Sequence, residues 1–127
     1  HTQLPEVYLW AEGEMKPLTQ FHKEFSSTYR IPRHEVVQWH SEDGSRVEGV
    51  YLYPLDITEG DPAPLVVQIH GGPKGRVTRS LRSYYMSSVW ASEGYGVLLP
   101  NFRGSEGYGN AFAIKTDKKP KCLTIVC

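Results

Sequence analysis

The chain has 127 residues, of which 39% are hydrophobic and 22% are charged. Its 14 basic side chains balance 14 acidic ones, so no excess of positive charge indicates nucleic acid or an anionic membrane surface as a partner. The chain contains no apolar run of the roughly 18 residues needed to span a bilayer. This composition and length are typical of a globular domain with a hydrophobic core.

A short β-hairpin and a linker are predicted at the N-terminal end. The β-rich segment Glu6–Trp10 and the segment Pro17–Phe21 flank a glycine turn, so residues 5–20 are predicted to form the hairpin. Residues 22–33 are polar and end in a proline-containing stretch, which indicates a linker.

A second pair of strands is predicted at Glu35–His40 and Arg46–Pro54. Both segments are rich in β-branched and aromatic residues, and Asp43-Gly44 between them favours a tight turn. Residues 55–64 are then predicted to form a loop, because they contain Gly60, Pro62 and Pro64.

The next part of the chain has the pattern of a βαβ unit. Leu65–Ile69 is a nearly continuous apolar run, typical of a parallel strand buried on both faces. A helix is predicted over Ser80–Glu93, and Gly94 is suited to its C-terminal cap. The apolar run Tyr95–Pro100 is the second predicted strand, parallel to the first. The apolar face of the helix is predicted to comprise Leu81, Tyr85, Met86, Val89 and Trp90.

The first predicted parallel strand runs directly into His70-Gly71-Gly72-Pro73. Ligands of open α/β sheets bind outside the carboxyl ends of the strands. Glycines there let the backbone approach a substrate, and their exposed N–H groups can stabilise an oxyanion during acyl transfer. The same four residues are also compatible with a simple glycine turn.

A second motif, NFRGSEGYG at Asn101–Gly109, follows the next strand in the same way. Together with WHSEDG at Trp39–Gly44, the segment Pro64–Pro73 and the segment Gly94–Gly109, it resembles the prolyl oligopeptidase family of serine peptidases. The acylaminoacyl-peptidase and dipeptidyl-peptidase branch is the most similar. Residues 5–20 also resemble the closing strands of the β-propeller that precedes the hydrolase domain in that family.

The resemblance implies an α/β fold: an incomplete α/β-hydrolase sheet, preceded by a small hairpin from the end of a β-propeller. It implies strand order 1-2-4-3-5, with the fifth strand absent from the chain. The N–H of Gly72, or of Gly71 nearby, would be an oxyanion-hole donor. His70 would shape this loop rather than act as a general base, and Arg103 would anchor the RGS loop through carbonyls or a carboxylate.

The catalytic triad that the family implies is absent from this chain. No serine has a glycine two positions before it, as the nucleophile elbow G-x-S-x-G requires. Ser105 comes nearest, and it could pair in space with His70, but nothing in the sequence favours that pairing. The other histidines, His1, His22, His34 and His40, precede the hydrolase core and are predicted to be surface or loop residues.

The last eleven positions, residues 117–127, do not resemble the family and are predicted to be a foreign tail. Cys122 and Cys127 on this tail are predicted to be reduced thiols. The predicted domains are therefore residues 1–30 as propeller end and linker, 31–116 as the N-terminal part of the hydrolase domain, and the tail.

The sequence thus predicts a fragment of a serine peptidase that hydrolyses short peptides through an acyl-enzyme. Two alternatives stay open: a carboxylesterase of the same fold, and a non-catalytic truncated product that binds the full-length subunit. No cofactor or metal is expected. The lack of a secretory apolar segment favours the cytoplasm over secretion. The missing fifth strand would leave Leu65–Ile69 with an open edge, which predicts instability or self-association.

Overall fold

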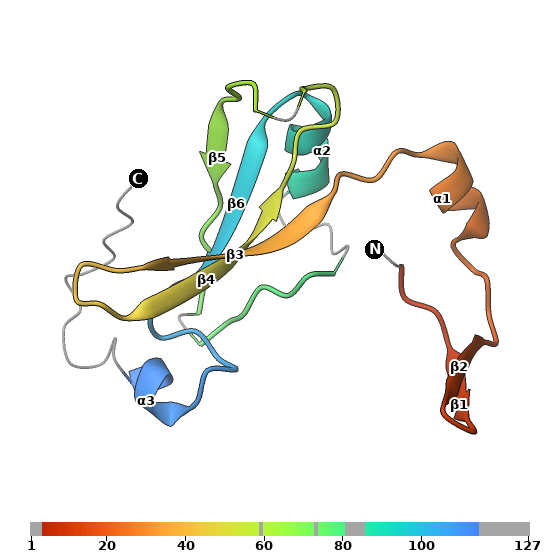
Figure 1. Ribbon diagram of the computed structural model, residues 1–127, viewed down its shortest axis with the longest axis horizontal. Coiled ribbons are helices and arrows are strands. Elements are labelled where there is room, and N and C mark those ends of the chain that lie inside the picture. The colour runs from red at the N-terminus through yellow and green to blue at the C-terminus, as the bar shows by residue number, and fades with distance from the viewer. Residues whose placement is uncertain (1–3, 59, 73, 81–85, 115–127) are drawn as a thin grey trace.

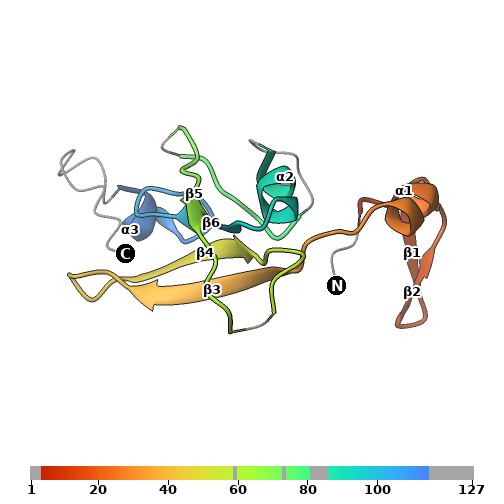
Figure 2. The same ribbon diagram turned by 90° about the horizontal axis from the view of Figure 1, so that it is seen from above.

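The computed structural model describes residues 4–58, 60–72, 74–80 and 86–114. In these residues the chain forms a two-stranded sheet and a four-stranded sheet. Figures 1 and 2 show the two-stranded sheet and the helix α1 to one side of the four-stranded sheet. No helix in the described ranges has the length and apolar character of a membrane span.

The predicted N-terminal hairpin is present, but its second strand begins earlier than expected. Strand β1 (Tyr8–Ala11) pairs antiparallel with β2 (Glu14–Pro17), so the prediction of a return strand at Pro17–Phe21 is wrong. Glu12 and Gly13 between the strands both have positive φ, of 54° and 82°. A two-residue turn with positive φ at both positions reverses the chain at once, and the return strand therefore starts at Glu14.

The segment 22–33, predicted to be a linker, contains the helix α1 (Lys23–Thr28). The carboxylate of Glu6 explains where this helix begins. It accepts hydrogen bonds from the backbone N–H groups of Phe21 (3.1 Å) and His22 (2.9 Å) and from the hydroxyl of Thr19. A carboxylate at the start of a helix satisfies N–H groups that have no partner within the helix. The polarity of the segment gave no sign of this distant partner.

The N-terminal unit should lose stability in acid because of Glu6. The Thr19 hydroxyl and the backbone donors lower the pKa of Glu6 from 4.5 to about 2. A carboxyl group whose pKa is lower in the folded chain stabilises the fold above its unfolded pKa, and this contribution is lost as the pH falls from 4.5 through about 2. We expect the amide resonances of Phe21 and His22 to shift across that window in an NMR titration. In the Glu6→Gln variant the same titration should be flat, and an equal response there would contradict the assignment.

The main sheet has the strand order β3-β4-β6-β5. The pairs β3–β4 and β4–β6 are antiparallel, and β5–β6 is parallel. The sequence-based order 1-2-4-3 for the first four strands is therefore confirmed. The bounds agree with the predicted strands to within two residues: β3 is His34–His40, β4 is Arg46–Leu52, β5 is Leu65–Val67 and β6 is Gly96–Asn101.

The helix between the two parallel strands differs from its prediction. Helix α2 spans Ser87–Ser92, and residues 81–85, with Leu81 and Tyr85, lie outside the described residues. The helix buries Ser87 and Ala91, whereas the apolar side chains predicted to face the core are exposed at Met86, Val89 and Trp90. Small side chains one turn apart allow the helix backbone to lie close to β4 and β6. Gly94, at φ 88°, caps its C-terminal end as predicted.

The hydrophobic core lies between α2 and the middle of the sheet. It consists of Val50, Leu52, Ala91, Val97 and Leu99. The prediction that β5 is buried on both faces is wrong, because Leu65 is 50% exposed and Ile69 is 42% exposed. In the described ranges no strand pairs with the outer side of β5. Self-association through this edge stays a prediction.

Candidate functional site

Two loops meet at the edge of the sheet where the parallel strands end. The glycine loop (residues 70–72 and 74–77) follows β5, and the RGS loop (residues 102–109) follows β6. The short helix α3 (Asn110–Ala113) comes directly after the RGS loop. Because β5 and β6 are parallel neighbours, their carboxyl ends lie side by side, and the two sequence motifs come together as the prediction required.

Asn101, the last residue of β6, fastens the glycine loop to the sheet. Its buried side chain accepts a hydrogen bond from the N–H of Val77 (2.7 Å) and donates to the carbonyl of the same residue (2.8 Å). It also donates to the hydroxyl of Tyr108 (2.9 Å), which in turn donates to Glu48 on β4 (2.6 Å). Burial and the Glu48 carboxylate raise the pKa of Tyr108 to about 12. The sequence indicated Asn101 as the first residue of the NFRGSEGYG motif but not its contacts with Val77 and Tyr108.

His70 and Ser105 form the Ser-His pair for which the sequence offered no support. The Nε2 atom of His70 lies 2.8 Å from the Oγ of Ser105, and the imidazole stacks on the ring of Phe102 with centroids 4.5 Å apart. Ser105 is fully buried. A nucleophile must reach a substrate carbonyl, so this pair is a structural link between the two loops rather than a catalytic dyad.

Further contacts join the two loops. The N–H of Glu106 donates to the carbonyl of Gly75 (3.1 Å). The side chain of Arg76 lies where a Cβ at Gly107 would be, and the φ of 90° at Gly107 favours glycine there. Four described residues of the glycine loop thus contact the RGS loop or the end of β6: His70, Gly75, Arg76 and Val77.

Arg103 behaves as the sequence predicted and binds a carboxylate. Its guanidinium forms an ion pair with Asp43 in the turn between β3 and β4. Hydrogen bonds from the backbone N–H and the side chain of Ser45 lower the pKa of that carboxyl group, and the positive charge of Arg103 lowers it further. The RGS loop is therefore held at both ends, by Asp43 near its start and by Asn101 through Tyr108 near its end.

Gly71 and Gly72 remain exposed beside these anchored residues. Neither backbone N–H donates a hydrogen bond to another described residue. Gly72 has φ 138°, and a Cβ there would lie 2.8 Å from the backbone nitrogens of both Lys74 and Gly75. Only glycine fits this conformation. Two exposed amides on an anchored loop form a suitable receptor for a negatively charged oxygen.

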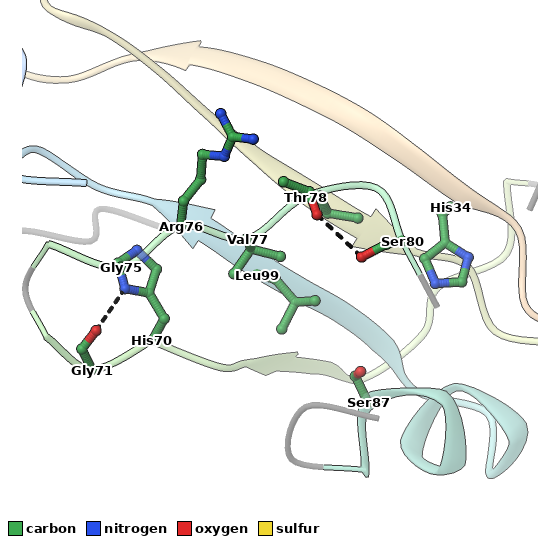
Figure 3. A pocket seen from close by; sticks show the side chains of 11 residues that line it. His34, His70, Gly71, Gly75, Arg76, Val77, Thr78, Ser80, Ser87 and Leu99 are labelled. Atoms are coloured by element: carbon green, nitrogen blue, oxygen red, sulfur yellow. Dashed lines mark hydrogen bonds between the residues drawn. The ribbon is translucent and has the colours of Figure 1, made fainter. Parts of the chain in front are cut away.

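A cavity of about 280 Å³ lies between the glycine loop and the sheet. Figure 3 shows His70, Val77 and Leu99 on its walls, with His34 at the far end. The prediction that His34 is a surface or loop residue is wrong: it is buried as the first residue of β3. Its Nδ1 lies 2.7 Å from the carbonyl of Pro32, and burial lowers its pKa. Across the described ranges, no three potential metal-ligating side chains cluster together.

The sequence is similar to those of known peptidases. An uncharacterized peptidase of Bacillus subtilis, YuxL, is 34% identical over 99 residues, which make up 78% of the chain and 15% of that relative. A probable dipeptidyl-peptidase 5 of Emericella nidulans is 35% identical over 72 residues, 57% of the chain and 10% of the relative. No family model matches the chain.

The fold is also similar to solved peptidase structures. The acylaminoacyl peptidase of Pyrococcus horikoshii superposes with a TM-score of 0.74 at 34% identity, over 87% of the chain and 17% of that structure. A puromycin-hydrolyzing peptidase of Mycobacterium tuberculosis superposes with a TM-score of 0.61 at 28% identity, over 80% of the chain and 16% of that structure. The chain spans less than one fifth of the length of these relatives. Because motifs, sequence and fold all agree, the chain belongs to the prolyl oligopeptidase family of peptidases.

Proposed function

We propose that residues 31–116 are the N-terminal part of the catalytic α/β-hydrolase domain of a serine peptidase. The order β3-β4-β6-β5 supports this proposal, because it equals the 1-2-4-3 order of the first four hydrolase strands. The hairpin β1–β2 would be the closing part of a preceding β-propeller, and residues 117–127 a tail foreign to the family. The parent enzyme would cleave peptide bonds of short peptides through an acyl-enzyme.

In that enzyme the glycine loop contributes to the oxyanion hole. The observation that carries this role is the pair of exposed amides at Gly71 and Gly72, which donate to no described residue. When a serine attacks the substrate carbonyl, the oxygen becomes negatively charged, and an N–H group directed at it stabilises that charge. Gly72 is the proposed donor, with Gly71 as the neighbouring alternative. The Ser-Asp-His triad is supplied by residues outside this chain.

The sequence of the transcript downstream of Thr116 tests the parentage directly. The proposal requires a G-x-S-x-G elbow there in one of the three reading frames, followed by an aspartate and a histidine in that order. A downstream sequence without such an elbow in any frame would contradict the proposal.

The 127-residue chain should have no hydrolase activity of its own. We expect no labelling by a fluorophosphonate probe, because no serine lies in an elbow sequence and Ser105, which comes nearest to one, is fully buried. The acylaminoacyl peptidase of Pyrococcus horikoshii serves as the positive control under the same conditions. Labelling of the chain that disappears in Ser105→Ala, or in any other single serine variant, would show that the chain contains its own nucleophile.

A further inference from the structure

The imidazole of His70 makes two polar contacts that together define its tautomer. Its Nδ1 lies 3.1 Å from the carbonyl oxygen of Gly71, and its Nε2 lies 2.8 Å from the Oγ of Ser105. A carbonyl oxygen can only accept a hydrogen bond, so Nδ1 must carry the proton. In the neutral ring Nε2 then accepts, and the hydroxyl of Ser105 is its donor. Figure 3 shows the contact between His70 and Gly71.

The carbonyl that His70 binds belongs to the same peptide group as the N–H of Gly72. A trans peptide group is planar, and its C=O and N–H bonds point in opposite directions. Fixing the Gly71 oxygen toward the buried imidazole therefore directs the Gly72 N–H away from it. We propose that His70 is a positioning residue, which sets the direction of the Gly72 N–H by holding the carbonyl of Gly71. This inference rests on the proposed oxyanion role of Gly72.

The surroundings of this contact restrict both partners. A Cβ at position 75 would lie 2.8 Å from the Gly71 oxygen and 2.9 Å from the Nδ1 of His70. Position 75 therefore has to be glycine for the contact to form. On the other side, the Phe102 ring stacks on the imidazole, and the buried Ser105 holds Nε2. The imidazole cannot turn without losing both contacts. Phe102 and Ser105 of the RGS loop therefore fix, through His70, the plane of the peptide group between Gly71 and Gly72.

Two variants of His70 distinguish the role of its ring nitrogens, which form hydrogen bonds, from the role of its ring, which stacks on Phe102. His70→Phe retains a ring that can stack on Phe102 but removes both nitrogens. His70→Asn retains an N–H donor at the position of Nδ1 and removes the ring and the contact with Ser105. If His70 acts through the Gly71 carbonyl, the asparagine variant should retain the function that the phenylalanine variant loses. A purely structural role of the ring predicts the reverse order.

NMR of the labelled 127-residue chain measures the peptide group itself. We expect His70→Phe to shift the ¹³C resonance of the Gly71 carbonyl and the ¹⁵N resonance of Gly72, and His70→Asn to restore both. Ser105→Ala and Gly75→Ala are second variants that disturb the same contact without changing His70, and they should shift the same two resonances. Unshifted resonances in His70→Phe and Gly75→Ala, with the β3–β4 amides unchanged, would overturn the inference.

Kinetics of the parent peptidase separate this inference from the proposed function. His70→Phe should lower kcat with little change in KM and should weaken binding of a peptide aldehyde, whose tetrahedral adduct carries the oxyanion. The loss should be smaller than the roughly 10²–10³-fold expected when a donor is deleted. His70→Asn should recover kcat. If deleting the Gly72 N–H has no effect on kcat, the proposed donor role of Gly72 fails, whatever the NMR result, and Gly71 remains as the alternative donor. If that deletion lowers kcat and His70→Phe does not, only the inference fails.

Discussion

Removal of the Gly72 N–H should lower the kcat of the parent peptidase on the order of 10²–10³-fold. The change is an ester in place of the amide, made by incorporating glycolic acid at position 72. The ester has no N–H and adds no side chain, so it tolerates the φ of 138° that the structure has there. KM should change little, because the donor acts mainly on the charge that develops in the transition state.

No amino-acid substitution at position 72 removes the N–H without also disturbing the loop. Proline fixes φ near −65°, far from the observed 138°, and would disrupt the loop as well as remove the donor. Alanine would place its Cβ 2.8 Å from two backbone nitrogens. The matched control is the same ester at Gly13, in the turn of the β1–β2 hairpin, where kcat should stay at the wild-type value. Wild-type kcat for the folded ester variant at position 72 would eliminate Gly72 as the donor.

Asn101→Asp should destabilise the chain by about 3–5 kcal/mol at neutral pH, the range for a buried charge without a partner. The side-chain amide donates to the Val77 carbonyl (2.8 Å) and to the Tyr108 hydroxyl (2.9 Å). An aspartate of the same shape would place a carboxylate oxygen against these two oxygens. We expect the thermal unfolding midpoint to fall by roughly 10 °C or more.

The pH dependence distinguishes this electrostatic effect from a general packing defect. Burial raises the pKa of the introduced carboxyl group above its unfolded value. Its protonated form can again donate to Val77, so the difference from wild type should shrink as the pH falls through the raised pKa. Tyr108→Phe is the matched control: it removes one partner of Asn101, leaves both contacts with Val77, and should cost only about 1–2 kcal/mol at every pH. A thermal midpoint of Asn101→Asp equal to wild type would show that the hydrogen bonds of Asn101 to Val77 and Tyr108 contribute nothing to stability.

The strands of the main sheet could be predicted because the residue pattern that indicates each strand lies within that strand. The apolar and β-branched runs around Val36, Val50 and Leu99 indicate strands without reference to any other part of the chain. Their order could not be derived from these runs and came from the resemblance to a family. The buried face of α2 was predicted wrongly, because the helical period identifies the apolar positions of a helix but not how closely the helix packs on the sheet. Close packing on β4 and β6 selects Ser87 and Ala91 instead of Trp90.

The contacts that were missed join residues far apart in the sequence. Helix α1 begins at a carboxylate about sixteen positions earlier, on Glu6. His70 and Ser105 are 35 positions apart. Asn101 reaches back to Val77. No local pattern carries such information, and each contact exists only after the parallel strands have placed the two loops side by side.

The strand order also has a consequence for synthesis of the chain. β5 leaves the ribosome before β6, but its only neighbour among the described strands is β6. The antiparallel pair β3–β4 can form as soon as it is made, whereas β5 must wait until Asn101 has been added. At about 5–20 residues/s this interval is roughly 2–7 s. During that time Leu65 to Ile69 is an unpaired apolar segment on a nascent chain, and it is there that a ribosome-associated chaperone would be needed.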